Sequence, residues 1–380
     1  MVAALAVLIL LIVPSVWCCW LTWRHLRFLA AEKQQKKRLH LKVLRLKRQQ
    51  HYLLITLAHP EGRPLPRAKA GQHLLLYYDD LQGKPVSRAY SLANDCHHRH
   101  FYQLAIKCEK NGRLSQSIFQ KLKQGDLLCT SYPKGHFLLQ NSNKPLVLIA
   151  AGVGITPMLA MAYQAIRQQR LWLPGNLLKR PLSQRHMPKR PMPKRKITLV
   201  YQCRDASQLL YHRLLQRLPG LNYVPVLSQP DANWQGKSGR VDMQYLLQLG
   251  GKDGHYYCCA SAAMTEQLAA DFSAAGVTHF SYELFSAGIS SQSFLISYQQ
   301  GQQQVHADSA GFATVLDALL ASGATIASDC RGGSCGLCKK RLISGQCKQV
   351  LEAAASCRAD EVLTCCIQPL SDLTLLDTAI

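Results

Sequence analysis

The chain has 380 residues, a formal net charge of +23 and fifteen cysteines. Hydrophobic residues make up 48% of it, which excludes a largely disordered chain and allows two or three domains with buried cores. An odd number of cysteines, several of them in strand-like segments, disfavours a disulfide framework and indicates a reducing compartment.

The first 23 residues contain a long apolar stretch. Residues 2–23, VAALAVLILLIVPSVWCCWLTW, carry no charge, and a helix of this length would cross a hydrocarbon core of about 30 Å. Tryptophans at its end, followed by Arg24 and Arg27, are typical of a membrane–water interface. We therefore expect a transmembrane anchor at residues 1–23 and a single-pass membrane protein whose other domains are cytoplasmic.

The positive charge is concentrated in two stretches, residues 24–48 and 167–196, which hold ten lysines and arginines each. We interpret 24–40 as a basic juxtamembrane linker and 171–196, with five prolines, as a disordered insertion. Both stretches are either solvated surface or segments attracted to anionic lipid or an acidic partner. No nucleic acid partner is expected, because neither stretch interleaves aromatic residues in a recognisable module.

Three further units follow along the chain. Residues 41–143 read as short alternating strands with turn signals, which predicts an antiparallel β-barrel. Residues 144–285 alternate continuous apolar strands with helical patterns, which predicts a parallel sheet covered on both faces. A linker at 286–293 leads to a third unit at 294–380.

The third unit contains the cysteine-rich stretch DCRGGSCGLC, residues 329–338. Cys330, Cys335 and Cys338 have the C-x4-C-x2-C spacing of plant-type [2Fe–2S] sites, in which thiolates hold two irons. The intervening glycines let backbone N–H groups turn toward the sulfurs. A zinc site is the main alternative, but zinc sites usually show a second close Cys or His pair, and the compartment disfavours a disulfide.

Such a cluster takes one electron at a time, so a nicotinamide donor would need a flavin between them. The strings RAYSLAN, from Arg88, and GRLS, residues 112–115, resemble the flavin-domain motifs of the ferredoxin–NADP reductase superfamily. The resemblance implies that Arg88 pairs with the FAD pyrophosphate, Tyr90 packs on the isoalloxazine and the Ser91 hydroxyl faces flavin N5. It also implies that Gly112 and Ser115 open a helix toward the pyrophosphate.

A buried strand runs into GVGITPM, residues 152–158, which resembles the nicotinamide-binding element of the same superfamily. The resemblance implies cofactor-binding roles for Gly152, Gly154, Thr156 and Pro157. It also places Cys259 beside the nicotinamide.

The segment around Cys259 departs from the usual C-G-P pattern, because Ala260 and Ser261 replace the glycine and proline. Phe285, in YELF, matches an aromatic residue that lies near the flavin and must yield to the nicotinamide. Arg204 and Ser228 are candidates at the adenosine end, and NADH and NADPH both remain possible donors.

The segment EVLTCCIQP resembles the C-terminal ferredoxin domain of multi-component reductases. This resemblance implies Cys365 as the fourth cluster ligand, with Cys366 as the alternative. The predicted fold is multi-domain: an N-terminal transmembrane helix, an antiparallel β-barrel FAD domain, an α/β parallel-sheet NAD(P)-binding domain and a β-grasp ferredoxin domain.

The predicted function is electron transfer from NADH or NADPH through FAD and the [2Fe–2S] cluster to an acceptor protein. The predicted acceptor is a membrane oxygenase or fatty-acid desaturase. The alternatives are a soluble oxygenase, a hybrid-cluster-type protein, or a redox sensor that does not turn over.

Overall fold

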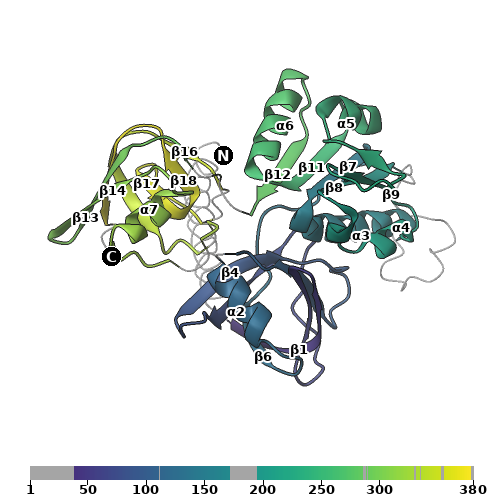
Figure 1. The fold of residues 1–380 in the computed structure, drawn as a ribbon, viewed down its shortest axis with the longest axis horizontal. Coiled ribbons are helices and arrows are strands. Elements are labelled where there is room, and N and C mark those ends of the chain that lie inside the picture. The colour runs from purple at the N-terminus through teal and green to yellow at the C-terminus, as the bar shows by residue number, and fades with distance from the viewer. Residues whose placement is uncertain are drawn as a thin grey trace, which may run out of the picture.

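The computed structural model describes residues 38–110, 112–171, 195–285, 288, 290–328, 331–333, 335–351 and 355–377. Three main sheets follow one another along the chain and form three lobes (Figure 1). Each lobe has a hydrophobic core of its own, and the middle lobe has one on each face of its sheet.

The first lobe is a six-stranded antiparallel sheet with the order β4-β3-β6-β1-β2-β5. Its strands curl around a core of leucine and isoleucine side chains, and the helix α2 lies against β3 and β4. The elements are β1 (Arg38–Gln49), β2 (Tyr52–Ala58), β3 (His73–Asp79), β4 (Pro85–Ser91), β5 (Tyr102–Lys107), α2 (Arg113–Lys121) and β6 (Leu127–Ser131).

The second lobe is a parallel sheet with the order β10-β9-β8-β7-β11-β12. β7 and β8 are almost fully buried because α3 and α4 cover one face of the sheet and α5 and α6 the other. The elements are β7 (Leu146–Ala151), η1 (Gly152–Gly154), α3 (Ile155–Leu171), β8 (Ile197–Cys203), η4 (Ala206–Gln208), α4 (His212–Gln216), β9 (Asn222–Leu227), β10 (Lys237–Ser238), α5 (Met243–Gly250), β11 (His255–Ala260), α6 (Ala262–Ala274) and β12 (Phe280–Leu284).

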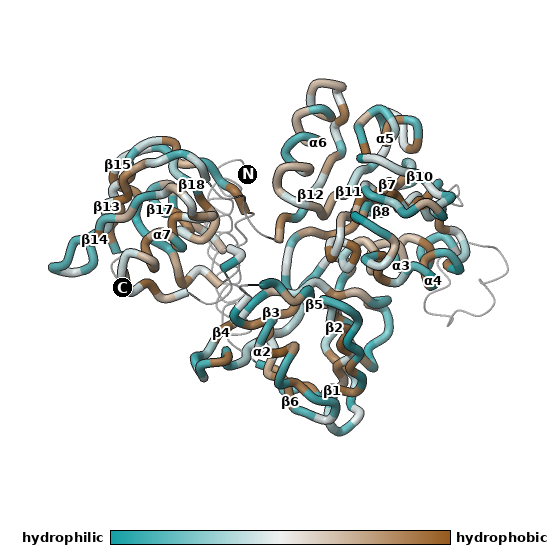
Figure 2. Tube along the Cα trace, viewed as in Figure 1, coloured by the Kyte–Doolittle hydropathy of each residue, from teal (hydrophilic) through white to brown (hydrophobic). Residues whose placement is uncertain are grey.

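The third lobe is a mixed sheet with the order β14-β13-β19-β15-β17, accompanied by the small pair β16-β18. The parallel pairing of β13 with β19 joins the two ends of the lobe. Figure 2 shows hydrophilic residues at the tip of the β13–β14 hairpin, which projects away from the other lobes. The elements are β13 (Leu295–Gln300), β14 (Gln303–Asp308), α7 (Val315–Ala321), β15 (Lys339–Ser344), β16 (Cys347–Gln349), β17 (Glu361–Leu363), η5 (Thr364–Cys366), β18 (Ile367–Pro369) and β19 (Leu373–Asp377).

The transmembrane helix of the predicted fold class requires a correction. Within the described ranges, no helix has both the length and the apolar character needed to cross a membrane. The longest of them, α3, has 17 residues and includes Arg167, whereas a span needs about 20 predominantly apolar residues. The expected anchor at residues 2–23 lies outside the described residues, as does residue range 172–194 of the basic insertion.

We therefore correct the fold class to the three-lobed architecture of Figure 1. The predicted single-pass membrane localisation depended on that helix, and we correct it for the same reason. The membrane and lipid contacts predicted from the same segments are not supported either.

Candidate functional site

The first lobe, whose curled sheet we call the barrel, meets the loop between β7 and α3 of the second lobe. A cavity of about 450 Å³ lies at this place. It is bounded by β4, β5, the start of α2, the start of α3 and the residue after β12. Seven of the residues that the sequence singled out for flavin or nicotinamide binding line this cavity: Arg88, Tyr90, Ser91, Gly112, Ser115, Thr156 and Phe285. They come from strands and helices up to about two hundred residues apart, so the fold gathers into one place what the sequence predicted separately.

One end of the cavity offers cations and backbone donors. Arg88 is half-buried and donates from Nη1 to the carbonyl of Ser87 at 2.8 Å. Gly112 is the N-cap of α2 and makes no side-chain cap, so the first N–H groups of the helix lack a side-chain acceptor. Ser115 holds the turn, because its hydroxyl accepts from the Glu109 N–H at 3.2 Å. A phosphate group fits this end, since both the helix N-terminus and Arg88 favour an anion.

At the other end, three elements of two lobes meet around Ser91. Its buried hydroxyl donates to Oε2 of Glu283 at 3.2 Å, although the two residues are 192 positions apart. Glu283 lies on β12 directly beside Cys259 of β11. Burial and the neighbouring Glu283 carboxylate raise the pKa of the fully buried Cys259 thiol well above its usual value. Cys259 is therefore a neutral thiol, and Phe285, 45% exposed, lines the cavity nearby.

The loop between β7 and α3 contains two glycines, Gly152 and Gly154, and the structure gives a reason for each. Gly152 has a φ of +52°, and a Cβ atom added to it would meet nothing within 4 Å. A Cβ atom on Gly154 would lie 2.0 Å from the carbonyl oxygen of Cys259, so only glycine allows this close approach. Thr156 is buried and donates from its hydroxyl to the Val153 carbonyl at 3.1 Å. Pro157 lies in the first turn of α3, where its missing N–H costs nothing. The open space beside Gly152 fits a dinucleotide phosphate.

The residues expected at the adenosine end of the nicotinamide lie together. Arg204 follows β8 and Ser228 follows β9, and these strands are parallel neighbours. The Arg204 guanidinium donates to Oε1 of Gln229 at 2.7 Å, and the Ser228 N–H donates to the Cys203 carbonyl at 2.9 Å. The structure therefore places the Arg204 cation beside the residues 228–229 that follow β9.

The departure from the family pattern at residues 260–261 has a structural role. Ala260 is the last residue of β11, and Ser261 is the N-cap of α6. The Ser261 hydroxyl accepts from the Met264 N–H at 3.4 Å. Serine is a favoured N-cap, so the change preserves the strand-to-helix turn.

In the third lobe, the described cysteines of the predicted cluster site gather beside η5. Cys338 and Cys365 are both buried, and their thiol groups lie close to each other. This contact and burial raise the pKa of Cys338, while Cys335 is close enough to add to the effect. Cys330 lies outside the described residues, and within the described ranges no group of three metal-ligating side chains suits a single ion. Iron would hold these sulfurs as thiolates, with two ligands on each iron.

Two glycines of the cluster loop, residues 329–338, have backbone conformations that favour glycine. Gly333 and Gly336 have φ values of +73° and +75°, in the left-handed region that glycine tolerates. The Gly333 N–H donates to the Cys365 sulfur. Cys366 lies 3.6 Å from Cys365, sulfur to sulfur, so the two buried thiols are direct neighbours.

Eight residues that line the 450 Å³ cavity were not predicted from the sequence: Ala89, Ala105, Lys107, Glu109, Arg113, Leu114, Val153 and Arg331. Arg113 directly follows Gly112. A cationic side chain beside a candidate phosphate site could have predicted from the sequence that Arg113 lines the cavity. Arg331 belongs to the cluster loop of the third lobe, and no local pattern connects it with the barrel. Glu283 belongs to the segment YELF, but its contact with Ser91 was not predictable from either segment.

Three family matches cover these lobes in order. Residues 48–138 match the oxidoreductase FAD-binding domain, residues 148–269 the oxidoreductase NAD-binding domain and residues 298–370 the 2Fe-2S iron-sulfur cluster binding domain. The chain therefore belongs to the ferredoxin–NADP reductase superfamily, in the class with a C-terminal [2Fe–2S] ferredoxin domain. It is an oxidoreductase that transfers electrons from NAD(P)H through FAD to a [2Fe–2S] cluster.

Relatives that match most of the chain include reductases of dioxygenases. The chain is 26% identical over 331 residues to the 3-chlorobenzoate-3,4-dioxygenase reductase subunit of Comamonas testosteroni, covering 85% of this chain and 91% of the relative. It is 27% identical to phthalate dioxygenase reductase of Burkholderia cepacia, covering 76% and 81%. A solved structure of a phthalate dioxygenase reductase matches with a TM-score of 0.61 at 23% identity, covering 91% of this chain and 99% of that one. This last likeness supports the fold.

Proposed function

We propose that the chain is the reductase component of an oxygenase system and delivers electrons to the oxygenase component. The observation that supports this most is the length of the similarity, because a dioxygenase reductase subunit matches 85% of the chain and includes all three lobes. The predicted acceptor, a membrane oxygenase or fatty-acid desaturase, depended on the membrane anchor and loses its support with that correction.

We propose that the 450 Å³ cavity binds the flavin, with its phosphates near Arg88 and the N-terminus of α2. Tyr90 would pack on the ring and Ser91 would face the reactive nitrogen. The hydrogen bond from Ser91 to Glu283 supports this arrangement, because it orients the hydroxyl and links it to a group that can hold a proton. Phe285 lines the same cavity and would have to move when the nicotinamide enters.

FAD held in this cavity would supply the step between a two-electron hydride donor and a one-electron cluster, and the residues around it would control access and orientation. Gly152, Gly154, Thr156 and Pro157 would shape the loop that receives the nicotinamide dinucleotide. The buried, neutral Cys259 would form the wall behind the nicotinamide. Arg204 and Ser228 would contact the adenosine end.

The proposed cluster ligands are Cys330, Cys335, Cys338 and Cys365. The mutual contact of Cys338 and Cys365 supports the choice of Cys365 over Cys366, and so does the N–H of Gly333 directed at the Cys365 sulfur. Backbone donors to the sulfurs stabilise the reduced cluster, because they compensate its added negative charge.

The test uses the purified chain loaded with FAD and the cluster, together with a purified oxygenase component of the dioxygenase type. We expect NAD(P)H-dependent reduction of ferricyanide and cytochrome c, and substrate oxidation when the oxygenase component is added. Reduction of the small acceptors without any electron transfer to that oxygenase would refute the proposed partner. A flavin that stays oxidised with excess NADH and NADPH would favour a redox sensor instead.

A further inference from the structure

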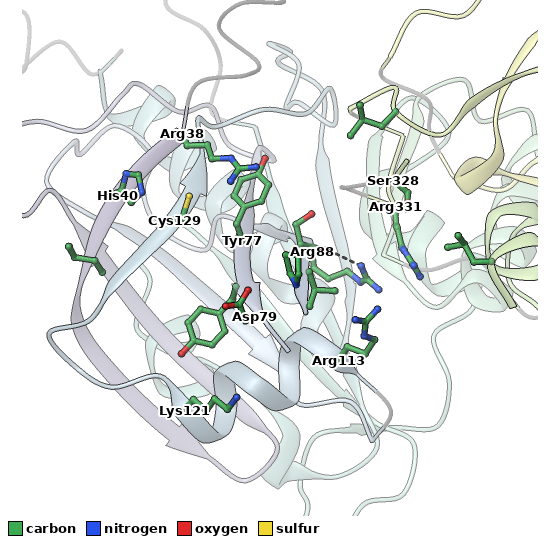
Figure 3. Close-up of a pocket in the computed structure, with 17 residues that line it drawn as sticks. Arg38, His40, Tyr77, Asp79, Arg88, Arg113, Lys121, Cys129, Ser328 and Arg331 are labelled. Atoms are coloured by element: carbon green, nitrogen blue, oxygen red, sulfur yellow. Dashed lines mark hydrogen bonds between the residues drawn. The ribbon is translucent and has the colours of Figure 1, made fainter. Parts of the chain in front are cut away.

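A second, larger cavity of about 970 Å³ lies between the barrel and the third lobe. Figure 3 shows it from the side of β3 and β4, with Tyr77 and Arg88 on the barrel and Ser328 and Arg331 on the third lobe. Arg88, Arg113 and Arg331 line both this cavity and the 450 Å³ cavity. The two cavities therefore adjoin at a cluster of three arginines, which we call the arginine junction.

The arginine junction contains more positive than negative charge. Arg113 donates to Oδ2 of Asp80 at 2.9 Å, and Arg331 pairs with Asp317 at 3.2 Å. Among the described residues, no carboxylate lies within ion-pair distance of Arg88. Burial and the nearby Arg331 lower the pKa of Arg88, as expected when two cations from different lobes approach each other. An anion in this space would relieve the repulsion.

The cluster loop holds Arg331 in position. Its φ is +48°, a left-handed conformation that is unfavourable for a residue with a side chain. The partner Asp317 lies on α7 and accepts from the Thr314 hydroxyl at 2.7 Å, so the carboxylate is itself fixed. In Figure 3 the guanidinium groups of Arg88, Arg113 and Arg331 approach one another across the gap between the lobes. Arg88 and Arg113 belong to the barrel, whereas Arg331 belongs to the third lobe.

We propose that Arg331 donates from the ferredoxin domain to the phosphate groups of the flavin bound at Arg88, so that the flavin joins the cluster domain to the barrel. The inference rests on the proposed flavin site. A diphosphate offers several anionic oxygens, and guanidinium groups bind such oxygens through paired hydrogen bonds. Electron transfer to the cluster then depends on the flavin in a second way, because the cofactor also holds the cluster domain close.

The test compares Arg331→Gln with Arg358→Gln in the full-length chain. Arg358 lies on the same lobe, its side chain is 78% exposed, and it is 3.9 Å from Glu361, so it controls for the loss of one surface charge. FAD binding to deflavinated protein is followed by the quenching of flavin fluorescence. We expect about tenfold weaker FAD binding in Arg331→Gln, the effect of losing one charge-assisted contact, and no change in Arg358→Gln.

Riboflavin, which lacks phosphate, separates a phosphate contact from general damage. Arg331→Gln should bind riboflavin as the unchanged chain does, whereas equal losses for riboflavin and FAD would overturn the proposal. Iron content and the visible spectrum show whether the variant keeps its cluster. Because Arg331 follows a proposed ligand, Arg331→Lys is the second variant: it keeps the charge and should bind FAD with intermediate affinity.

Small-angle scattering gives an independent measurement. Adding FAD to the deflavinated chain should lower its radius of gyration, and the decrease should be smaller in Arg331→Gln. Unchanged FAD affinity and unchanged compaction in Arg331→Gln would refute the role of Arg331. If the unchanged chain binds no FAD, the proposed flavin site fails instead, and the two failures remain distinguishable.

Discussion

The close approach of Gly154 to β11 leads to a prediction with a definite magnitude. In Gly154→Ala the new Cβ would lie 2.0 Å from the Cys259 carbonyl oxygen and 2.8 Å from its carbonyl carbon. Ordinary contact begins at about 3.4 Å, so backbone must shift by about 1.4 Å, and no side-chain rotation can relieve the overlap. Overpacking of this kind costs about 3 kcal/mol, which lowers the melting temperature by roughly 6–12 °C.

Gly152→Ala is the matched control, two residues away in the same loop. Its Cβ would meet nothing within 4 Å, so only the positive φ of +52° opposes it. That conformation costs about 1 kcal/mol, equivalent to roughly 2–4 °C. The new methyl group would instead fill the space proposed for the dinucleotide phosphate. We expect at least about tenfold weaker NAD(P)H binding, or roughly 1.4 kcal/mol.

The two variants are compared by thermal unfolding followed by circular dichroism, at one fixed FAD concentration because bound ligand raises the melting temperature. Nicotinamide binding is measured by stopped-flow flavin reduction. A Gly154→Ala melting temperature within about 2 °C of the unchanged chain would refute the steric reasoning. Wild-type nicotinamide affinity in Gly152→Ala would refute the proposed phosphate position.

Four further predictions concern single side chains. Cys365→Ser should lose the [2Fe–2S] absorption and electron paramagnetic resonance signals while Cys366→Ser keeps them, and the reverse result would exchange the proposed ligands. Ser91→Ala should still bind FAD, but the reduction of FAD by NAD(P)H should be about a hundredfold slower because an oriented donor is lost. Stopped-flow absorbance measures this rate, and an unchanged rate would contradict the role of Ser91. Arg204→Ala should raise the KM for NADPH about tenfold and that for NADH little, because only NADPH carries the 2′-phosphate; equal increases would argue against a phosphate contact. Burial, with nearby Lys134 and His136, lowers the pKa of His73 to about 4. Between pH 6.5 and 4 the unfolded chain therefore binds more protons at this residue than the folded chain does. The free energy of unfolding should therefore fall by roughly 3 kcal/mol over that range relative to His73→Leu, and parallel pH profiles from urea titrations would refute this.

Continuous motifs made the cofactors predictable. The strings RAYS, GVGITPM and DCRGGSCGLC each hold their chemistry within ten residues. RAYS ends the strand β4, and GVGITPM forms the turn from β7 into α3. The succession of short alternating strands and then strand–helix units was also readable, because each pattern repeats with the period of its own structure. The apolar stretch at residues 2–23 led instead to a transmembrane fold class that is corrected above.

Contacts between lobes could not be predicted in this way. The Ser91–Glu283 hydrogen bond joins β4 to β12 across 192 residues, and it depends on the strand order that places β12 at the sheet edge nearest the barrel. The arginine junction likewise needs the third lobe to lie against the barrel, which no periodicity within either segment specifies.

The amino-acid sequence by itself determined which cofactors this protein carries and the order of the domains that hold them, because phosphate loops and cluster loops are local structures with strict residue requirements. Only the tertiary structure decided that Arg331 of the cluster loop lies beside Arg88, and that Cys365 lies close to Cys338. These relations depend on how separate surfaces pack, and packing is decided by shape and burial summed over whole lobes.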